Sequence, residues 1–245
     1  MTETALLAAF FFAAATLYSS VGHAGASGYL AVMALVGMAP EVMKPTALLL
    51  NIIVASIATA RFYRAGFFSW AVFWPFTLSS IPFAAVGGAL SVPAPLYSVI
   101  VGAILLLAAY RLFFYTEVPA AIRRPVPLLP GLAWGAGVGF VSGLTGIGGG
   151  IFLSPLLLLA GWADVRKSAG VAAAFVLVNS LAGIAGHVAA VGSVPRAIAL
   201  WAVAAALGGV VGSELGVRQL AEVTLRRLLA VVLAIAGLKL ILARR

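Results

Sequence analysis

Apolar residues fall in ten runs along the chain, separated by glycine, proline and charge clusters. A helix needs about 20 apolar residues to cross the hydrocarbon of a bilayer, so most of these runs predict membrane-spanning helices. The runs are, in order, residues 5–21, 29–39, 46–60, 70–90, 96–115, 128–144, 151–161, 168–188, 197–211 and 225–242. Two of them, residues 29–39 and 151–161, are too short to cross alone. The pattern predicts an all-α, polytopic membrane protein.

The runs occur twice in the same order, on either side of one polar linker. Glu41–Lys44 in the first half corresponds to Asp164–Lys167 in the second, and further pairs follow in the same order. We therefore expect a first transmembrane repeat at residues 1–115, a cytoplasmic linker at residues 116–127 and a second repeat at residues 128–245. Each repeat is predicted to hold four transmembrane helices, and the two repeats are predicted to be inverted relative to each other.

Glycine clusters interrupt the first helix of each repeat. Gly143–Gly150 contains five glycines in eight residues, and Gly22–Gly28 is a looser copy. Each glycine costs a helix about 1 kcal/mol relative to alanine, so both helices are predicted to break into V-shaped hairpins. Non-helical backbone at membrane depth is tolerated only when it is buried in protein or lines a polar cavity. The two breaks are therefore predicted to form the halves of one binding site.

The composition places the chain in a membrane and limits its chemistry. It is 64% hydrophobic and 9% charged, with a mean hydropathy of +1.17. The net charge of +9 lies mostly in short connections, where basic residues indicate topology rather than nucleic-acid binding. There is no cysteine, which excludes disulfides, thiolate metal sites and iron–sulfur clusters. We predict no cofactor, no bound metal and no enzymatic activity.

The distribution of lysine and arginine favours one orientation. In the inverted arrangement, ten of the 15 basic residues face the cytoplasm and five face outward, against nine and six if each broken pair crosses continuously. We therefore expect a multi-pass protein of the cell inner (plasma) membrane with both termini outside. The segment Met1–Thr4 has no basic residue before the first apolar run, so that run is expected to be kept as a helix.

Helices that begin inside a membrane point unpaired N–H groups and the positive end of their dipole at the break, which attracts anions. Polar side chains in the nearby apolar runs could add donors, although glycine can serve helix packing alone and asparagine can simply link helices. The predicted substrate-binding residues are Gly25, Ser27, Gly28, Asn51, Thr145, Gly148, Gly149, Gly150 and Asn179.

His23 lies inside the first break, and histidine is the side chain whose ordinary pKa lies near neutral pH, which makes this residue a candidate for proton coupling. A structural role is the alternative for this residue. His187 corresponds in position to Arg61 and is expected to anchor a helix end at the interface.

Three other functions remain open. A passive anion channel would use the same donors, and a non-transporting subunit would use none of them. Gly25–Gly28 also spells G-x-S-G, which in an intramembrane serine protease would present Ser27 as a nucleophile. Against the protease, Ser27 corresponds to Gly150 in the second copy, so a nucleophile would explain only one of the two breaks.

Several motifs resemble the TauE/SafE family of sulfite and organosulfonate exporters. They are Gly146–Phe152 followed by Pro155, Ala169–Ala172, Asn179–Gly183, Gly186–His187, His23–Leu30, Lys44–Ala47 and Asn51. The resemblance covers nearly the whole chain. It implies a secondary transporter that exports a small anion, such as sulfite or a sulfonate, by alternating access around the two breaks.

Overall fold

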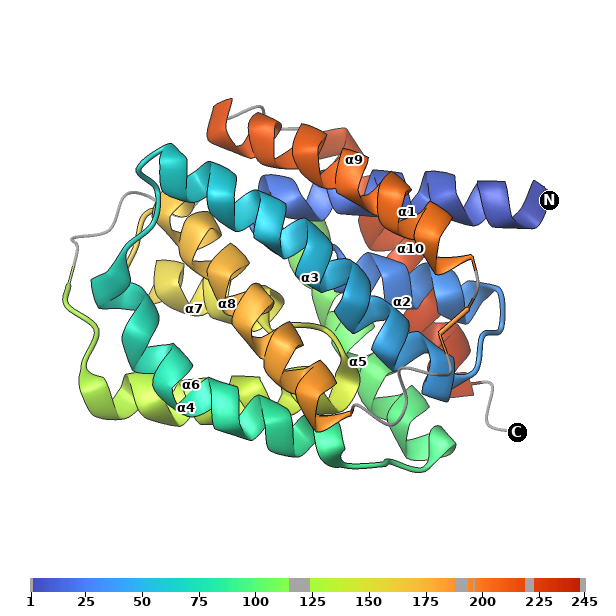
Figure 1. Ribbon diagram of the computed structural model, residues 1–245, viewed down its shortest axis with the longest axis horizontal. Helices are drawn as coiled ribbons and strands as arrows, with labels where there is room; N and C mark the ends of the chain where they lie inside the picture. Colours follow the sequence, from blue (N-terminus) through green and yellow to red (C-terminus); the bar gives the residue numbers. More distant parts are fainter. Residues whose placement is uncertain (1, 115–123, 188–193, 196, 219–222, 243–245) are drawn as a thin grey trace.

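The computed structural model describes residues 2–114, 124–187, 194–195, 197–218 and 223–242, and most of the predicted linker lies outside these ranges. The described residues form ten α-helices and no strand (Figure 1). The helices are α1 (Thr2–Ser20), α2 (Ala26–Leu35), α3 (Pro40–Arg64), α4 (Trp70–Ala89), α5 (Ala94–Phe113), α6 (Leu128–Thr145), α7 (Gly150–Leu159), α8 (Val165–Gly186), α9 (Ile198–Arg218) and α10 (Val223–Leu242). The all-helical prediction is confirmed.

Six helices, α3, α4, α5, α6, α8 and α9, are long and apolar enough to cross a membrane. Helices α2 and α7 have ten residues each and would extend only about 15 Å at 1.5 Å per residue, as their short apolar runs predicted. Helix α3 is longer than expected at both ends. Proline is tolerated in a first turn, so Pro40 and Glu41 begin the helix, and Arg61 and Arg64 suit the negative end of its dipole.

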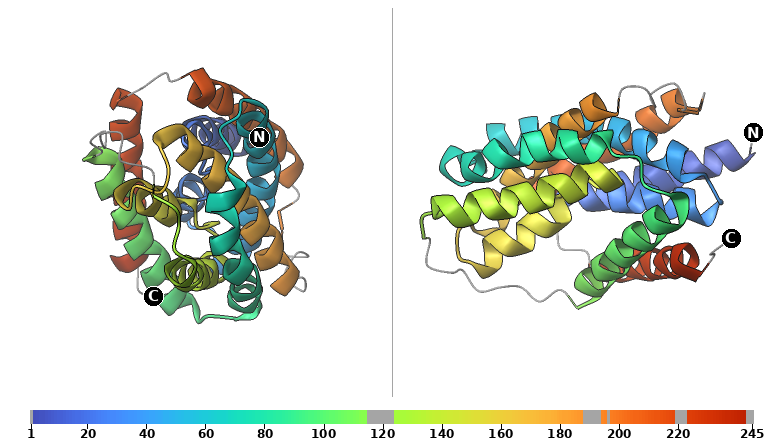
Figure 2. Two further views of the ribbon diagram at one scale, coloured as in Figure 1. Left: turned by 90° about the vertical axis from the view of Figure 1, so that its left-hand side faces the viewer. Right: turned by 90° about the horizontal axis from the view of Figure 1, so that it is seen from below.

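The helices form parallel pairs that run in opposite directions on the two sides of the molecule. In Figure 1, α1 and α9 both run from right to left along the top, whereas α4 and α6 both run from left to right along the bottom. Between these pairs, α3 and α8 cross in opposite directions. Figure 2 shows α5 and α10 side by side on a further face.

Glycines at every fourth position allow the backbones of each parallel pair to approach closely. On α6, a Cβ added to Gly139 would lie 2.4 Å from the carbonyl oxygen of Ser80, and one at Gly143 would lie 1.9 Å from that of Ala84. On α9, a Cβ added to Gly212 would lie 2.0 Å from the oxygen of Thr16. Such small-residue spacing is a common way to pack membrane helices.

The second interruption is narrower than the predicted segment Gly143–Gly150. Gly143 stays helical and packs on α4, α6 continues to Thr145, and α7 begins at Gly150. Packing therefore explains Gly143, whereas Gly146, Gly148 and Gly149 form the non-helical backbone.

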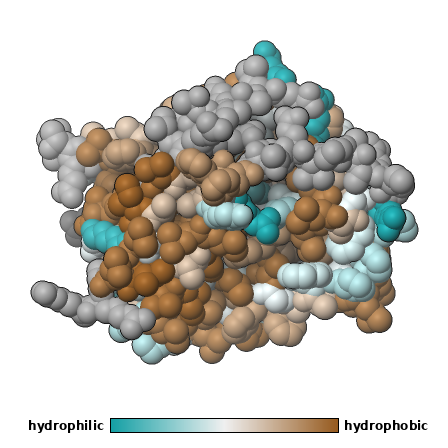
Figure 3. All heavy atoms as spheres, turned by 180° about the vertical axis from the view of Figure 1, so that it is seen from behind, coloured by the Kyte–Doolittle hydropathy of each residue, from teal (hydrophilic) through white to brown (hydrophobic). Residues whose placement is uncertain are grey.

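Large apolar side chains lie both inside and outside the bundle. Phe11, Tyr29 and Trp201 meet edge to face in the core, with ring centroids 5.4 Å and 5.3 Å from Phe11. Figure 3 shows apolar side chains spread over the back of the molecule. Large apolar residues such as Trp70 and Leu78 are also exposed. An apolar exterior of this kind suits contact with lipid.

Candidate functional site

Two short non-helical segments share a pattern of positive φ angles. We call residues 22–25 (Gly-His-Ala-Gly) the first break and residues 146–149 (Gly-Ile-Gly-Gly) the second break. The first, third and fourth residues of both breaks have positive φ, at +78°, +61° and +118° in the first break and +83° three times in the second. This match pairs Gly25 with Gly149. Ser27 therefore corresponds to Ile151, and the expected correspondence with Gly150 was wrong by one residue.

A short helix begins directly after each break, and neither has a side-chain cap. The N-cap residues Gly25 and Gly149 are in the left-handed region and carry no side chain that could accept a hydrogen bond. By contrast, the Asp164 carboxylate at the start of α8 accepts a hydrogen bond from the Lys167 backbone N–H at 2.9 Å.

The uncapped helix starts are also buried. Ala26 and Ser27 are 1% and 3% exposed, and Ile151 is 8% exposed. The first N–H groups of a helix have no partner within that helix, and they carry the positive end of its dipole. Buried starts without caps therefore suit a negatively charged ligand.

The two breaks lie against each other. The His23 Nε2 atom is 2.8 Å from the Ser154 hydroxyl on α7, and a Cβ added to Gly150 would lie 3.1 Å from the His23 ring. The structure thus brings together His23 of the first break and Gly150 at the start of α7. Ser154 was missed, although it is a polar residue one turn after Gly150 in an otherwise apolar helix.

Asn51 on α3 lies against the second break. Its Nδ2 group is 3.5 Å from the Gly146 carbonyl oxygen and 3.4 Å from the Ser180 hydroxyl on α8. The Asn179 Nδ2 group donates to the Phe175 carbonyl oxygen of its own helix at 2.8 Å. Both amide groups predicted as donors therefore already face protein acceptors, and for Asn51 this contact links two helices.

A tyrosine hydroxyl bonds to one carbonyl group inside the first break and another to the carbonyl group just before the second break. Tyr97 on α5 donates to the Thr145 carbonyl oxygen at 2.9 Å, and Tyr29 on α2 donates to that of Ala24 at 2.7 Å. The Thr145 hydroxyl donates to the Val141 carbonyl oxygen of its own helix at 2.7 Å, which differs from its predicted role toward a ligand.

Gly28 and Ser27 lie in the first turn of α2. A Cβ added to Gly28 would lie 2.6 Å from that of Ala14, so this glycine allows α2 to pack closely on α1. The structure pairs the His23 imidazole with Ser154. A nucleophilic Ser27 would need a base within hydrogen-bond reach, and this pairing offers no support for that role.

The sequence comparisons agree with this architecture. The family model "Sulfite exporter TauE/SafE" matches residues 6–240. The chain belongs to the TauE/SafE family. It is also 40% identical, over 244 residues, to the "Probable membrane transporter protein y4hK" of Sinorhizobium fredii (strain NBRC 101917 / NGR234), which covers 98% of this chain and 99% of that protein. No solved structure matches. The predicted resemblance is confirmed, and this TauE/SafE protein is a multi-pass membrane transporter.

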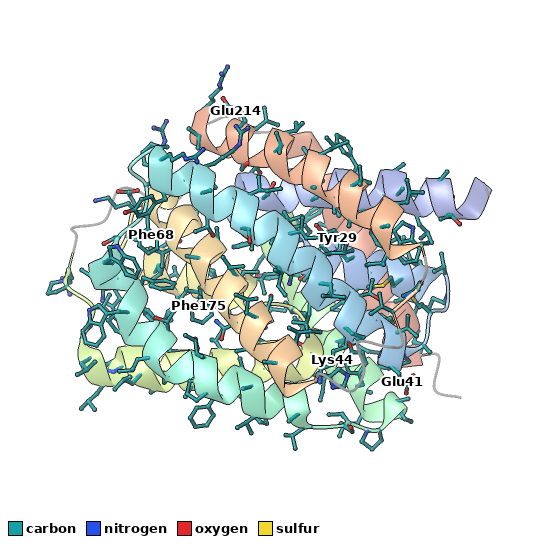
Figure 4. The ribbon with its side chains drawn as sticks, in the orientation of Figure 1. Tyr29, Glu41, Lys44, Phe68, Phe175 and Glu214 are labelled. Atoms are coloured by element: carbon teal, nitrogen blue, oxygen red, sulfur yellow. The ribbon has the colours of Figure 1, made fainter. Side chains whose placement is uncertain are left out.

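Lys44, near the start of α3 in this TauE/SafE protein and labelled in Figure 4, bonds to the end of α4 and lies beside the second break. Its Nζ group donates to the carbonyl oxygens of Gly88 at 2.9 Å and Leu90 at 3.4 Å. A Cβ added to Gly146 would lie 3.1 Å from the Lys44 carbonyl oxygen. The pKa of His187 is lowered, chiefly by burial and next by the nearby charge of Lys44. A hydrogen bond to the Gly88 backbone raises this pKa but does not cancel the other two effects.

Proposed function

We propose that the chain is a secondary transporter that exports a small anion, such as sulfite or a sulfonate, by alternating access around the two breaks. The observation that carries this proposal is the meeting of two buried, uncapped helix starts from opposite halves of the chain. Their peptide N–H groups can bind an anion without a buried lysine or arginine. The family of sulfite exporters to which the chain belongs supports a sulfur oxyanion as the substrate.

An inverted relation between the halves is supported by how the helices pack. Helices α1–α5 would form the first repeat, and α6–α10 would form the second. Exchanging the repeats converts the α4–α6 pair into the α9–α1 pair, and it maps the α3–α8 and α5–α10 pairs onto themselves. Corresponding helices, such as α1 and α6 or α3 and α8, run in opposite directions in Figure 1. This is the packing expected of inverted repeats with a site at their interface.

Proton coupling is proposed for His23. Its imidazole lies between the breaks and contacts Ser154 of the other half, so its protonation would change a contact between the repeats. Rocking of one repeat against the other would make and break this contact while the site opens to alternate sides.

We propose that the protein lies in the cell inner (plasma) membrane, with the basic end of the helix bundle in the cytoplasm and both chain termini outside. The end of α3, the start of α8 and the end of α9 gather on the left of Figure 1 and carry Arg61, Arg64, Arg166, Lys167 and Arg218. The start of α1 and the end of α10 lie toward the other side. An excess of basic residues marks the cytoplasmic side.

Purified protein in liposomes would test the proposal. Vesicles that contain the protein and are loaded with sulfite or a small sulfonate should release the anion faster than protein-free vesicles. In a second experiment, an imposed pH gradient should drive accumulation of the anion against its own concentration gradient. A passive channel would equilibrate the anion without accumulation. No protein-dependent flux of any small sulfur anion would contradict the proposal.

A further inference from the structure

Two buried side-chain oxygens beside the site have no assigned role. Asn51 and Asn179 are both 0% exposed, and neither Oδ1 atom has a hydrogen-bond partner among the residues that the structure describes. A buried acceptor without a donor loses its interaction with water and gains nothing in return. Two such atoms near one break therefore point to a donor that arrives with a ligand.

Rotating the amide groups would not remove these free acceptors. The Nδ2 atom of Asn51 faces the Gly146 carbonyl oxygen, and that of Asn179 faces the Phe175 carbonyl oxygen. Exchanging N and O would place an oxygen against a carbonyl oxygen in both cases, so these carbonyl groups favour the orientation in which Oδ1 is free. At Asn51 the Ser180 hydroxyl, 3.4 Å away, can pair with either end of the carboxamide, so Asn179 is the clearer case.

Asn51 lies against the second break. Asn179 lies on the face of α8 whose neighbouring residues Phe175 and Ser180 approach that break. A Cβ added to Gly148 would lie 2.9 Å from the Asn51 Nδ2 atom. A Cβ added to Gly149 would lie 2.9 Å from the Phe175 ring, which is labelled in Figure 4. Asn179 follows Phe175 by one helical turn on the same side of α8. The break therefore has free acceptors beside the helix start that offers N–H donors.

We propose that Asn51 and Asn179 select anions that carry an O–H or N–H donor of their own. This inference rests on the proposed transport function. The anionic oxygens would accept hydrogen bonds from the start of α7, while the hydroxyl or ammonium group of the same solute donates to the asparagine oxygens. An anion without a donor leaves these acceptors unpaired, and sites with unpaired polar groups discriminate strongly against such analogues.

Three sulfonates of nearly equal size would test this selection in proteoliposomes. They are propane-1-sulfonate, which has no donor, 2-hydroxyethanesulfonate, which adds an O–H at the same net charge, and 2-aminoethanesulfonate, which adds an ammonium group and is a zwitterion of zero net charge. The hydroxyl probe is therefore the one that changes the donor alone. We expect wild-type protein to transport at least one donor-bearing sulfonate about tenfold better than propane-1-sulfonate, measured as flux at equal subsaturating concentrations. The hydroxyl and ammonium probes separate the two possible donors.

Asn179→Leu should reduce this ratio to about one, and Asn51→Leu should act in the same direction. Asn179→Leu is the more direct test, because its lost Nδ2 bond lies within α8, whereas Asn51→Leu also removes a link between helices. Thr77→Val is the matched control. It removes a buried hydroxyl that is bonded within its own helix on α4, and it should leave the ratio unchanged.

The outcomes separate this inference from the function on which it rests. Absence of flux for all three probes and for sulfite would contradict the transport proposal itself. Equal flux of the three sulfonates through wild-type protein would overturn the selection while leaving transport intact. Equal flux that requires sodium would also overturn it, because a cation would then be the partner of the asparagine oxygens. An unchanged ratio in folded Asn179→Leu would remove that residue from the proposal.

Discussion

The first break and the second break have left-handed backbone at the same three positions, yet their surroundings differ. The first contains His23 and a strained Ala24, and its Tyr29 contact comes from the helix that follows it. The second is built of glycine and one isoleucine, and α3, α5 and α8 surround it through Asn51, Tyr97 and Phe175. The comparison indicates that both breaks need the backbone shape. The first also supplies a titratable group, whereas the second is lined by polar and aromatic side chains from three other helices.

The largest effect is expected from filling the second break. Gly149 has φ +83°, and an added Cβ would lie 2.9 Å from both Phe175 and Val138, so Gly149→Val should abolish anion flux in liposomes. Gly137→Val is the control. Gly137 lies on α6, the helix that leads into the second break, and a Cβ added there would have no atom of another helix within 4 Å. Wild-type flux from Gly149→Val protein would contradict the proposed site.

The side chains at the second position of each break should have different roles. His23→Ala should abolish the response of flux to a pH gradient, because it removes the titratable group beside Ser154. Ile147→Ala changes the corresponding residue and should preserve the response, whatever it does to the rate. Flux should be measured at several imposed gradients. A gradient response that survives in His23→Ala would assign proton coupling elsewhere.

The first glycines of the two breaks should differ in their tolerance of a methyl group. A Cβ added to Gly22 would lie 2.0 Å from the Ala169 carbonyl oxygen, whereas one at Gly146 would lie 3.1 Å from that of Lys44. Both have positive φ, so Gly146→Ala should cost about 1 kcal/mol and Gly22→Ala about 2–3 kcal/mol. Thermal unfolding in detergent would rank them, and the reverse order would contradict the described packing.

The smallest effects are expected from the two tyrosine hydroxyls. Tyr29→Phe and Tyr97→Phe each remove one hydrogen bond to a carbonyl group beside a break, which should cost about 1 kcal/mol of stability. Only Tyr97 joins the two proposed repeats, so Tyr97→Phe should also change the flux, whereas Tyr29→Phe should not. Equal effects on flux would show that the distinction between local and inter-repeat contacts has no functional consequence.

The sequence predicted the elements that depend on local composition. Clustered glycines beside short apolar runs located both interruptions, and the motifs around them identified the family. The predicted width of the second break was wrong. Gly143 belongs to a series of glycines, one at every fourth position from Gly131, that pack on α4. That spacing is visible in the sequence and could have assigned Gly143 to helix packing.

Side-chain directions could not be predicted in the same way. Whether a buried carboxamide offers its nitrogen or its oxygen depends on which carbonyl groups lie beside it, and for Asn51 the neighbour is Gly146 from the other half of the chain. The pairing of His23 with Ser154 is equally non-local, since it joins the first break to helix α7, 131 residues along the chain. Residue type alone indicated that these side chains form hydrogen bonds. Only the packing showed which of their atoms donate and which accept.

The pairing of α1 with α9 also determines when α1 can reach its packed position during synthesis. The Ser19 hydroxyl on α1 donates to the Gly209 carbonyl oxygen at a separation of 190 residues. At 5–20 residues per second, a ribosome would need roughly 10–40 s to synthesise that interval. Helix α1 must therefore remain in the lipid or with an insertion factor until α9 has been made.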